Sequence, residues 1–271
     1  MLETSAEQII LQRDIATPEE INLEAIALTL GAKVKRRPLT GCEARILGKD
    51  NNAIITVNLN SIEERQRFSI GHELGHWQCH RGESFKCSKN DIGNFKKSSN
   101  QKESEADAFS ADLLMPWFLF NPITRKLDKA DFNAVFKIAE RFRTSTGATA
   151  RRLIESNIFP AVLICHEKSG RQWFRRSKDI PQRWFPQKDL LPESAAFDIV
   201  YGKAKSDTEQ ISVCASAWFD RREAERYEVL EHSISYGTGR SLTLLEFFEI
   251  DMLEEYEKIE PPRGLDALKW K

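Results

Sequence analysis

The chain has 271 residues, of which 41% are hydrophobic and 30% are charged, and its formal net charge is −1 at pH 7. This composition is typical of a globular protein with one large or two modest domains, and it excludes a polycation that binds nucleic acid through bulk charge. No apolar run approaches the roughly 20 residues of a membrane span, and the N-terminus lacks the pattern of a secretion signal, so no membrane partner is expected.

The cysteines are odd in number, scattered, and contain no CxxC pair: Cys42, Cys79, Cys87, Cys165 and Cys214. This usage does not resemble a disulfide framework, and it favours reduced thiols in a cytoplasmic protein. Cys79 and Cys87 lie near a group of histidines and are the candidates for redox-sensitive thiols.

The first predicted elements are a helix and two strands. Residues 17–30 are expected to form a helix, with Thr17 as N-cap, Pro18 in the first turn, and Gly31 as the stop. Its apolar face is expected to contain Ile21, Ala25 and Leu28. Two strand-like stretches follow at 33–39 and 52–58.

The next helix is predicted from Glu63 to about Cys79 and contains the sequence GHELGH. His72 and His76 are four residues apart, so they lie on one helix face and can bind a single metal ion. Glu73 lies at the flank of that face, where a carboxylate can take a proton from a metal-bound water. The pattern predicts a catalytic zinc site, although manganese or iron could use the same ligands.

His80 continues the four-residue spacing but is not expected to be a ligand. It is eight helical residues from His72, about 12 Å of rise, whereas two nitrogens on one zinc ion lie within roughly 3.5 Å. We expect a capping or supporting role at the helix end. A polar loop is predicted over residues 81–101.

The third ligand is expected in a helix over 102–116, in the sequence KESEAD. Glu103 and Asp107 share a helix face, which permits Glu103 to bind zinc while Asp107 hydrogen-bonds the free N–H of a zinc-bound histidine. Glu105 is expected to face solvent. The alternative is that these carboxylates only stabilise a helix N-terminus.

Residues 126–158 are predicted to hold two short helices broken near Thr144–Gly147, the outline of a helix-turn-helix. Seven Lys and Arg against four Asp and Glu give this segment a basic character. Direct DNA contact is one interpretation but is not favoured, since this charge is small. A helical spacer, or a surface that recognises a protein substrate, are the alternatives. The arginines concerned are Arg141, Arg143, Arg151 and Arg152.

Residues 159–271 are predicted to form a small α/β domain on an antiparallel sheet. Strand-like or apolar segments are expected at 159–167, 170–176, 196–204, 210–219 and 240–248, and a helix around 245–258. A group of aromatic residues among arginines is interpreted as core, with a ligand platform as the alternative. These residues are Trp173, Phe174, Trp184 and Phe185.

The stretches RQRFSIGHELGHWQCH and ESEADAFSADLLMP together resemble the ImmA/IrrE family of metallo-endopeptidases. The resemblance covers about residues 15–120. It implies a gluzincin-like zinc peptidase, with His72, His76 and Glu103 as ligands and Glu73 as general base. It also implies cleavage of helix-turn-helix transcriptional repressors, which derepresses stress or mobile-element genes.

The layout is similar to the longer branch of this family, which implies an α+β protein in three parts: a zincin-like peptidase domain at 1–125, the helix-turn-helix-like segment at 126–158, and a GAF-like sensor domain at 159–271. Such peptidases commonly stabilise the oxyanion with tyrosine or histidine. All four tyrosines lie beyond residue 200, so His80 and His166 stay open as candidates.

The leading hypothesis is therefore a cytoplasmic zinc endopeptidase that cleaves a regulatory protein. The alternative is a non-proteolytic DNA- or protein-binding regulator with a structural metal or none. A complete HExxH with Glu103 argues against the alternative, because a purely structural site does not need Glu73.

Overall fold

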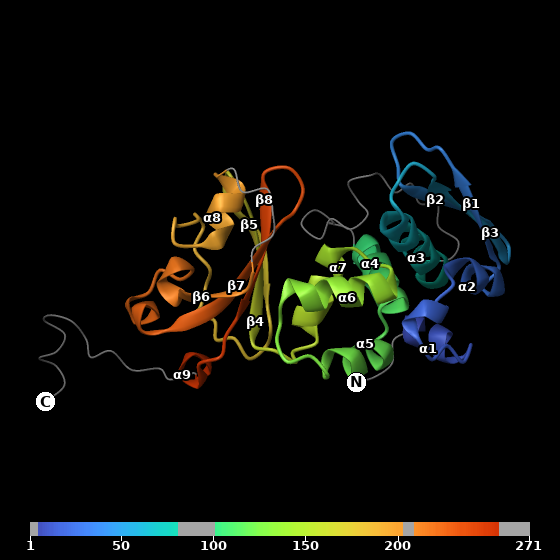
Figure 1. The fold of residues 1–271 in the computed structure, drawn as a ribbon. Helices are drawn as coiled ribbons and strands as arrows, with labels where there is room; N and C mark the ends of the chain where they lie inside the picture. The colour runs from blue at the N-terminus through green and yellow to red at the C-terminus, as the bar shows by residue number, and fades with distance from the viewer. Residues whose placement is uncertain (1–4, 81–100, 203–208, 255–271) are drawn as a thin grey trace, which may run out of the picture. The chain divides into compact units, whose positions relative to one another are not determined.

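The computed structural model describes residues 5–80, 101–202 and 209–254 (Figure 1). The chain divides into two compact units, residues 1–159 and 160–271, which are described separately below. Helices and sheets occur in both units, which confirms the predicted α+β class. In the described ranges, no helix has both the length and the apolar character that a bilayer span requires.

The first unit combines a small sheet with a group of helices (Figure 1). The sheet has the order β1-β3-β2, with β1 parallel to β3 and β2 antiparallel to it. Its strands are β1 (Ala32–Arg37), β2 (Ala44–Lys49) and β3 (Asn52–Asn58). The helices are α1 (Ser5–Leu11), α2 (Leu23–Thr29), α3 (Glu63–Cys79), α4 (Gln101–Leu114), α5 (Trp117–Thr124), α6 (Phe132–Phe142) and α7 (Thr146–Glu155).

Strand β2 was not predicted, because an edge strand that is mostly exposed carries little apolar alternation. Only Ala44 is fully buried in it, while Leu47 is 67% exposed. The strand is defined by pairing with the more apolar β3, in which Ile55 and Val57 are fully buried. Tertiary pairing thus decides a strand that its own composition does not indicate.

The single helix predicted over residues 17–30 is wrong in its start and in part of its buried face, since Ile21 is buried as predicted. Residues Pro18–Glu20 form a 3-10 turn, η1, and α2 begins afterwards with Asn22 as its N-cap. The Asn22 side chain accepts a hydrogen bond from the Ala25 backbone N–H at 3.0 Å, which satisfies a free donor of the first turn. Leu28, which was expected on the buried face, is 68% exposed. The side chains that pack in its place are Leu23, Ile26 and Ala27.

Helix α3 occupies the range predicted for the HExxH helix and lies in the interior of the first unit. Its side chains Ile70, Leu74 and Trp77 are buried. Helix α4 packs along it and ends before Pro116, as predicted (Figure 1). The predicted loop at 81–101 lies outside the described residues except for Gln101, which begins α4.

The two helices predicted within residues 131–157 are confirmed as α6 and α7. Asp131 caps α6 by accepting from the Ala134 N–H at 2.7 Å, and Ser145 caps α7 by accepting from the Ala148 N–H at 3.2 Å. Arg143 ends α6 in the left-handed conformation, with φ of 53°. A role of this helix pair as a helix-turn-helix remains a prediction.

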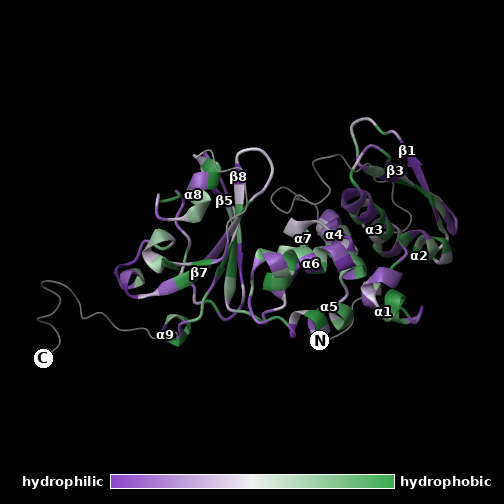
Figure 2. Cartoon of the chain, in the orientation of Figure 1, coloured by the Kyte–Doolittle hydropathy of each residue, from purple (hydrophilic) through white to green (hydrophobic). Residues whose placement is uncertain are grey.

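The second unit is built on a five-stranded sheet in the order β5-β4-β8-β7-β6, with every pair antiparallel. Its most apolar strand, β4, is coloured largely green in Figure 2. One face packs on a core that includes Val162, Ile164, Trp184 and Trp218. The strands are β4 (Ala161–Glu167), β5 (Gly170–Arg176), β6 (Ile211–Cys214), β7 (Glu228–Ser235) and β8 (Arg240–Glu246), and the helices are α8 (Ala195–Val200) and α9 (Ile250–Leu253).

Three segments of this unit differ from prediction. The segment 196–204, expected to be strand-like or apolar, contains most of helix α8, whose buried residues Ala196, Ile199 and Val200 follow helical spacing. Strand β7 was missed, because its sequence EVLEHSIS contains polar residues that become buried only in the sheet. The predicted helix at 245–258 is reduced to α9, and residues 255–258 lie outside the described part.

The aromatic group predicted as core is divided between core and surface. Trp184 is fully buried and Phe174 packs against the core, as expected. Phe185 is instead 55% exposed. Short 3-10 turns η2 (Ala215–Ala217) and η3 (Arg222–Arg226) complete the unit.

Candidate metal centre

The side chains of His72, His76 and Glu103 converge inside the first unit. Nε2 of His72 lies 3.0 Å from Nε2 of His76. The Glu103 carboxylate lies 3.2 Å from Nε2 of His72 and 3.5 Å from Nε2 of His76. One ligand atom from each residue lies within 4.8 Å of the others, and all three are placed for one ion.

This donor set fits a catalytic metal ion. Ligand atoms on a tetrahedral zinc ion are separated by roughly 3.5 Å, close to the separations found here. Two imidazole nitrogens that face each other at 3.0 Å, with a carboxylate beside them, form an arrangement that a shared cation stabilises. Two histidines and one carboxylate also leave a coordination position for water or substrate.

Asp107 lies behind His72 on the side away from Glu103. Its carboxylate is 2.8 Å from Nδ1 of His72, and both side chains are buried. A carboxylate at this distance keeps the proton on Nδ1, so the lone pair of Nε2 faces the other ligands. The structure therefore places Asp107 where the sequence spacing expects it.

His80 takes the corresponding position behind His76. Nδ1 of His80 lies 3.2 Å from Nδ1 of His76, and Nε2 of His80 lies 2.9 Å from the Glu105 carboxylate. Glu105 is 45% exposed, as expected, but its contact with His80 was not predicted from the helix wheel. Both ring nitrogens of His80 therefore have contacts, one with His76 Nδ1 and one with Glu105. The His80 ring lies on the side of His76 opposite to Nε2.

Glu73 is completely buried, and neither of its carboxylate oxygens has a hydrogen-bond partner among the described residues. Burial raises the pKa of this carboxyl group to about 7, the nearby His72 lowers it, and Glu103 raises it further. An unpartnered buried carboxyl group is costly, and such a group beside metal ligands is typical of a general base. Burial also lowers the pKa of His76, which keeps its imidazole neutral.

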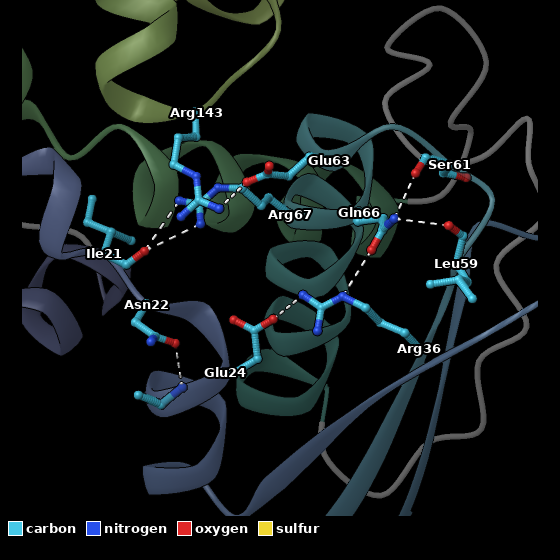
Figure 3. Close-up of polar contacts among 11 residues, drawn as sticks. Ile21, Asn22, Glu24, Arg36, Leu59, Ser61, Glu63, Gln66, Arg67 and Arg143 are labelled. Carbon is cyan, nitrogen blue, oxygen red and sulfur yellow. Dashed lines mark hydrogen bonds and ion pairs between the residues drawn. The ribbon is translucent and has the colours of Figure 1, made fainter.

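The first turns of α3 are held by polar contacts to its neighbours (Figure 3). Gln66 donates to the carbonyl groups of Ser61 and Leu59 at 2.7 and 3.3 Å and accepts from Arg36 at 3.0 Å. Arg67 is buried, with both terminal nitrogens 3.4 Å from the Ile21 carbonyl, and burial lowers its pKa to about 10. These contacts fix the position of the helix that carries both histidines.

Glycines allow α4 to approach α3 closely enough for Glu103 to reach the histidines. A Cβ atom on Gly75 would lie 2.9 Å from Cα of Ala106, closer than real Cβ contacts. Gly71 faces Ser110, whose hydroxyl donates to the Phe68 carbonyl at 2.8 Å. Both glycines therefore lie where the backbones of α3 and α4 approach closely.

The arginines of α6 and α7 are largely committed to contacts inside the first unit. Arg152 is buried, contacts Asp112 at 2.8 Å, and donates to the Met115 carbonyl at 2.7 and 3.0 Å. Arg141 pairs with Glu19 and Arg143 pairs with Glu63. Because Arg152 is buried, it is not placed to contact a DNA phosphate. The basic surface of residues 126–158 is therefore smaller than the sequence indicates.

His166, the other candidate for oxyanion stabilisation, lies in the second unit. It is completely buried beside Trp218, with ring centroids 5.7 Å apart. The described cysteines are free, and burial raises the pKa of the Cys79 thiol, which opposes a reactive thiolate there. Cys87 lies outside the described residues.

Comparison with known proteins relates this site to a family. Residues 27–154 match peptidase family M78, described as the IrrE N-terminal-like domain, which confirms the resemblance inferred from the motifs. A solved Mycobacterium tuberculosis transcriptional regulator is similar at a TM-score of 0.57 and 12% identity, over 93% of this chain and 90% of that chain. That identity shows a likeness of fold alone. No curated protein matches the chain significantly.

Proposed function

We propose that the protein is a cytoplasmic zinc-dependent endopeptidase, on the premise that its residues 27–154 match the IrrE N-terminal-like domain. We propose as its substrate a specific regulatory protein, a helix-turn-helix transcriptional repressor, whose cleavage derepresses stress or mobile-element genes. The observation that carries the proposal is the unpartnered, buried carboxylate of Glu73 beside the convergent His72, His76 and Glu103.

The proposed ligands are His72, His76 and Glu103, with Asp107 orienting His72. A zinc ion held there would polarise a peptide carbonyl and lower the pKa of a bound water. Manganese or iron could occupy the same ligands. The free cysteines of the described residues agree with a reducing compartment.

In this mechanism Glu73 acts at both proton transfers. Its carboxylate takes the proton of the attacking water, holds it in a buried environment, and then delivers it to the leaving amine nitrogen. The pKa of about 7 agrees with both roles, because the same group must accept and release a proton near neutral pH. Asp107 keeps the proton on Nδ1 of His72 throughout, so the lone pair of Nε2 stays available for a metal ion.

Strand β2 supports a peptide as substrate. It is an edge of the first sheet, and its Gly48 packs against the ring of Trp77, the residue next to His76. Free backbone groups on an edge strand can pair with an extended peptide. A peptide added along β2 would therefore run past the helix that carries the ligands.

The test is cleavage of a candidate repressor by the purified full-length protein. We expect a helix-turn-helix repressor encoded beside this gene to be cut into defined fragments when zinc, manganese or iron is supplied, and to stay intact with a chelator. A candidate that is never cut with any of these metals, but whose DNA binding is still altered by the protein, would support the alternative of a non-proteolytic regulator.

Two observations favour that alternative. The first is the helix pair α6 and α7. The second is that the solved protein with a similar fold is itself a transcriptional regulator. The variant Glu103→Ala separates the two functions. Under the proposed peptidase function it loses metal and cleavage together, whereas a metal-independent regulator keeps its effect on the repressor.

A further inference from the structure

Three polar side chains lie in one row across the sheet of the second unit. His166 of β4 is the register partner of Arg171 on β5 and of Ser241 on β8. Directly opposed residues of antiparallel strands point to the same face, so the three side chains are neighbours. They share this face with Val162 and Ile164, which belong to the core of the unit.

A register shift between Cys165 and His166 helps to create the row. Across it, the partner of Cys165 is Trp173 whereas the partner of His166 is Arg171, so one residue of β5 is left unpaired. Such a bulge re-aims the side chain beside it. The guanidinium of Arg171 is further held over the rings of Phe174 and Phe185, at 5.1 and 4.5 Å from their centroids.

All three side chains contain buried polar atoms that no group in the described part of the chain reaches with a hydrogen bond of normal geometry. These atoms are Nδ1 and Nε2 of His166, Oγ of Ser241 and Nη1 of Arg171. His166 and Ser241 are completely buried. A buried polar atom without a partner is strongly unfavourable, so four of them in one row indicate an additional group that binds between them.

The polar residues next to this row are, in contrast, well paired. Glu231 accepts from Trp218 Nε1 at 2.9 Å, from the Ala196 N–H at 3.0 Å and from the Ser233 hydroxyl at 2.8 Å. The hydroxyls of Ser233 and Thr243 are 2.7 Å apart. Within the described residues of the second unit, the missing partners are therefore confined to Arg171, His166 and Ser241, and do not reflect a poorly packed sheet.

The chemistry of the row favours a ligand with anionic oxygens. Arg171 offers a charged N–H donor, Ser241 an O–H, and His166 one N–H, since burial keeps its ring neutral with a pKa of about 4. Backbone hydrogen-bonding groups of Gln187 and Lys188, together with the exposed Asp189, raise the pKa of this ring and so offset part of the burial effect. A carboxylate can accept from all three donors, and the rings of Trp218, Phe174 and Phe185 suit an apolar body attached to it.

We propose that the second unit binds a small organic carboxylate between Arg171, His166 and Ser241, next to Trp218. This site is separate from the metal centre and does not depend on the peptidase function. It gives the second unit a ligand chemistry of its own, as a regulatory domain would need.

The test is calorimetric titration of the metal-loaded full-length protein with acetate, pyruvate and benzoate in a carboxylate-free buffer. We expect saturable binding of at least one probe at one site per chain, weakened at least about tenfold in His166→Leu and Arg171→Gln. Arg240→Gln is the matched control. Arg240 precedes Ser241 on β8 but points to the other face, where it pairs with Glu167, so binding should be unchanged.

Thermal unfolding without ligand shows whether the variants fold. His166→Leu removes two unpartnered nitrogens, so its midpoint should equal or exceed that of the unmodified protein. A midpoint several degrees lower would show a structural partner for the ring and would overturn the proposal. Absence of saturable binding with all three probes would also overturn it. So would binding to both variants with the affinity of the unmodified protein, or a crystal structure with only ordered water between the three side chains. Measurements of cleavage activity are not needed for any of these outcomes.

Discussion

The carboxylate of Asp107 lies 2.8 Å from Nδ1 of His72, although the two residues are 35 positions apart. The contact joins α4 to α3 and orients one proposed ligand. Substituting Asp107 by Asn keeps a hydrogen-bonding side chain but removes the negative charge. We expect metal affinity to fall about 10- to 100-fold, measured by competition with a metal chelator.

Glu105→Gln is the control for this substitution, because Glu105 is on the same helix but contacts His80 and is largely exposed. Its metal affinity should change little. Equal losses in both variants would contradict a specific role for Asp107 and would indicate a general effect of charge on α4.

Substituting Glu73 by Gln should separate metal binding from catalysis. The amide has nearly the same shape but cannot accept the proton of a water molecule at neutral pH. We expect metal content to stay unchanged while the rate of repressor cleavage falls about 100- to 10,000-fold. Metal content can be measured by elemental analysis and cleavage by the appearance of fragments. Cleavage at the original rate would refute the general-base role.

The substitution Gly75→Ala tests the close packing that brings Glu103 to the histidines. The added methyl group would lie 2.9 Å from Cα of Ala106, so α4 must move away from α3. We expect the free energy of unfolding to fall by about 1–3 kcal/mol and metal affinity to fall with it. The control is Ala108→Ser on the exposed side of α4. If Gly75→Ala left metal affinity intact, the close packing of α4 on α3 would not determine the geometry of the metal site.

Arg152 should behave as a structural residue and not as a DNA contact. Arg152→Gln leaves the partly buried Asp112 without this partner and removes the hydrogen bonds to Met115. We expect a loss of about 3–5 kcal/mol in the free energy of unfolding. Arg141→Gln breaks an exposed pair with Glu19 and should change stability little. Urea unfolding of both variants checks the contrast, and a stable Arg152→Gln protein would be inconsistent with it.

Stability of the second unit should depend on pH through His166. Burial lowers the pKa of His166 to about 4, with Arg171 lowering it further and Asp189 raising it, whereas the unfolded value is about 6.5. Between these pH values the unfolded chain binds a proton that the folded protein does not, so this contribution to stability falls as pH decreases from 6.5 to 4. The contribution becomes constant above about pH 7, where the unfolded chain also releases this proton.

The variant His166→Leu cannot bind that proton in either state. The difference in unfolding free energy between the unmodified protein and the variant should therefore change between pH 6.5 and 4 and stay constant above pH 7. Chemical unfolding of both proteins across this range provides the measurement. A difference that does not vary with pH would show that the ring titrates normally in the folded protein.

Much of the candidate site was predictable because it depends on local helix geometry. His72 and His76 share a face of α3 through their spacing alone, and Glu103 and Asp107 share a face of α4 in the same way. The exclusion of His80 as a direct ligand follows from helix rise, and its contact with His76 Nδ1 agrees with a supporting place behind the ligand. The roles of these residues stay predictions until metal and activity are measured.

Other features were not predictable, because distant segments decide them. Strand β2 is defined by its pairing with β3, and Arg152 is buried by contacts with Asp112 and Met115 that its basic neighbourhood does not indicate. The buried face of α2 is the one that packs against β1 and α3, and the polar residues of β7 are buried by neighbouring strands. In each case the surrounding structure outweighs local propensity.

The sequence by itself determined which donor atoms each helix presents, because the 3.6-residue period of an α-helix fixes the relation between positions four apart. Only the tertiary structure decided that these two helices meet. Glycines on α3 face α4 and let the two backbones approach, which brings Glu103 within 3.2 Å of His72. The row of Arg171, His166 and Ser241 has the same origin, since strand register, which no single strand encodes, places three separate residues side by side.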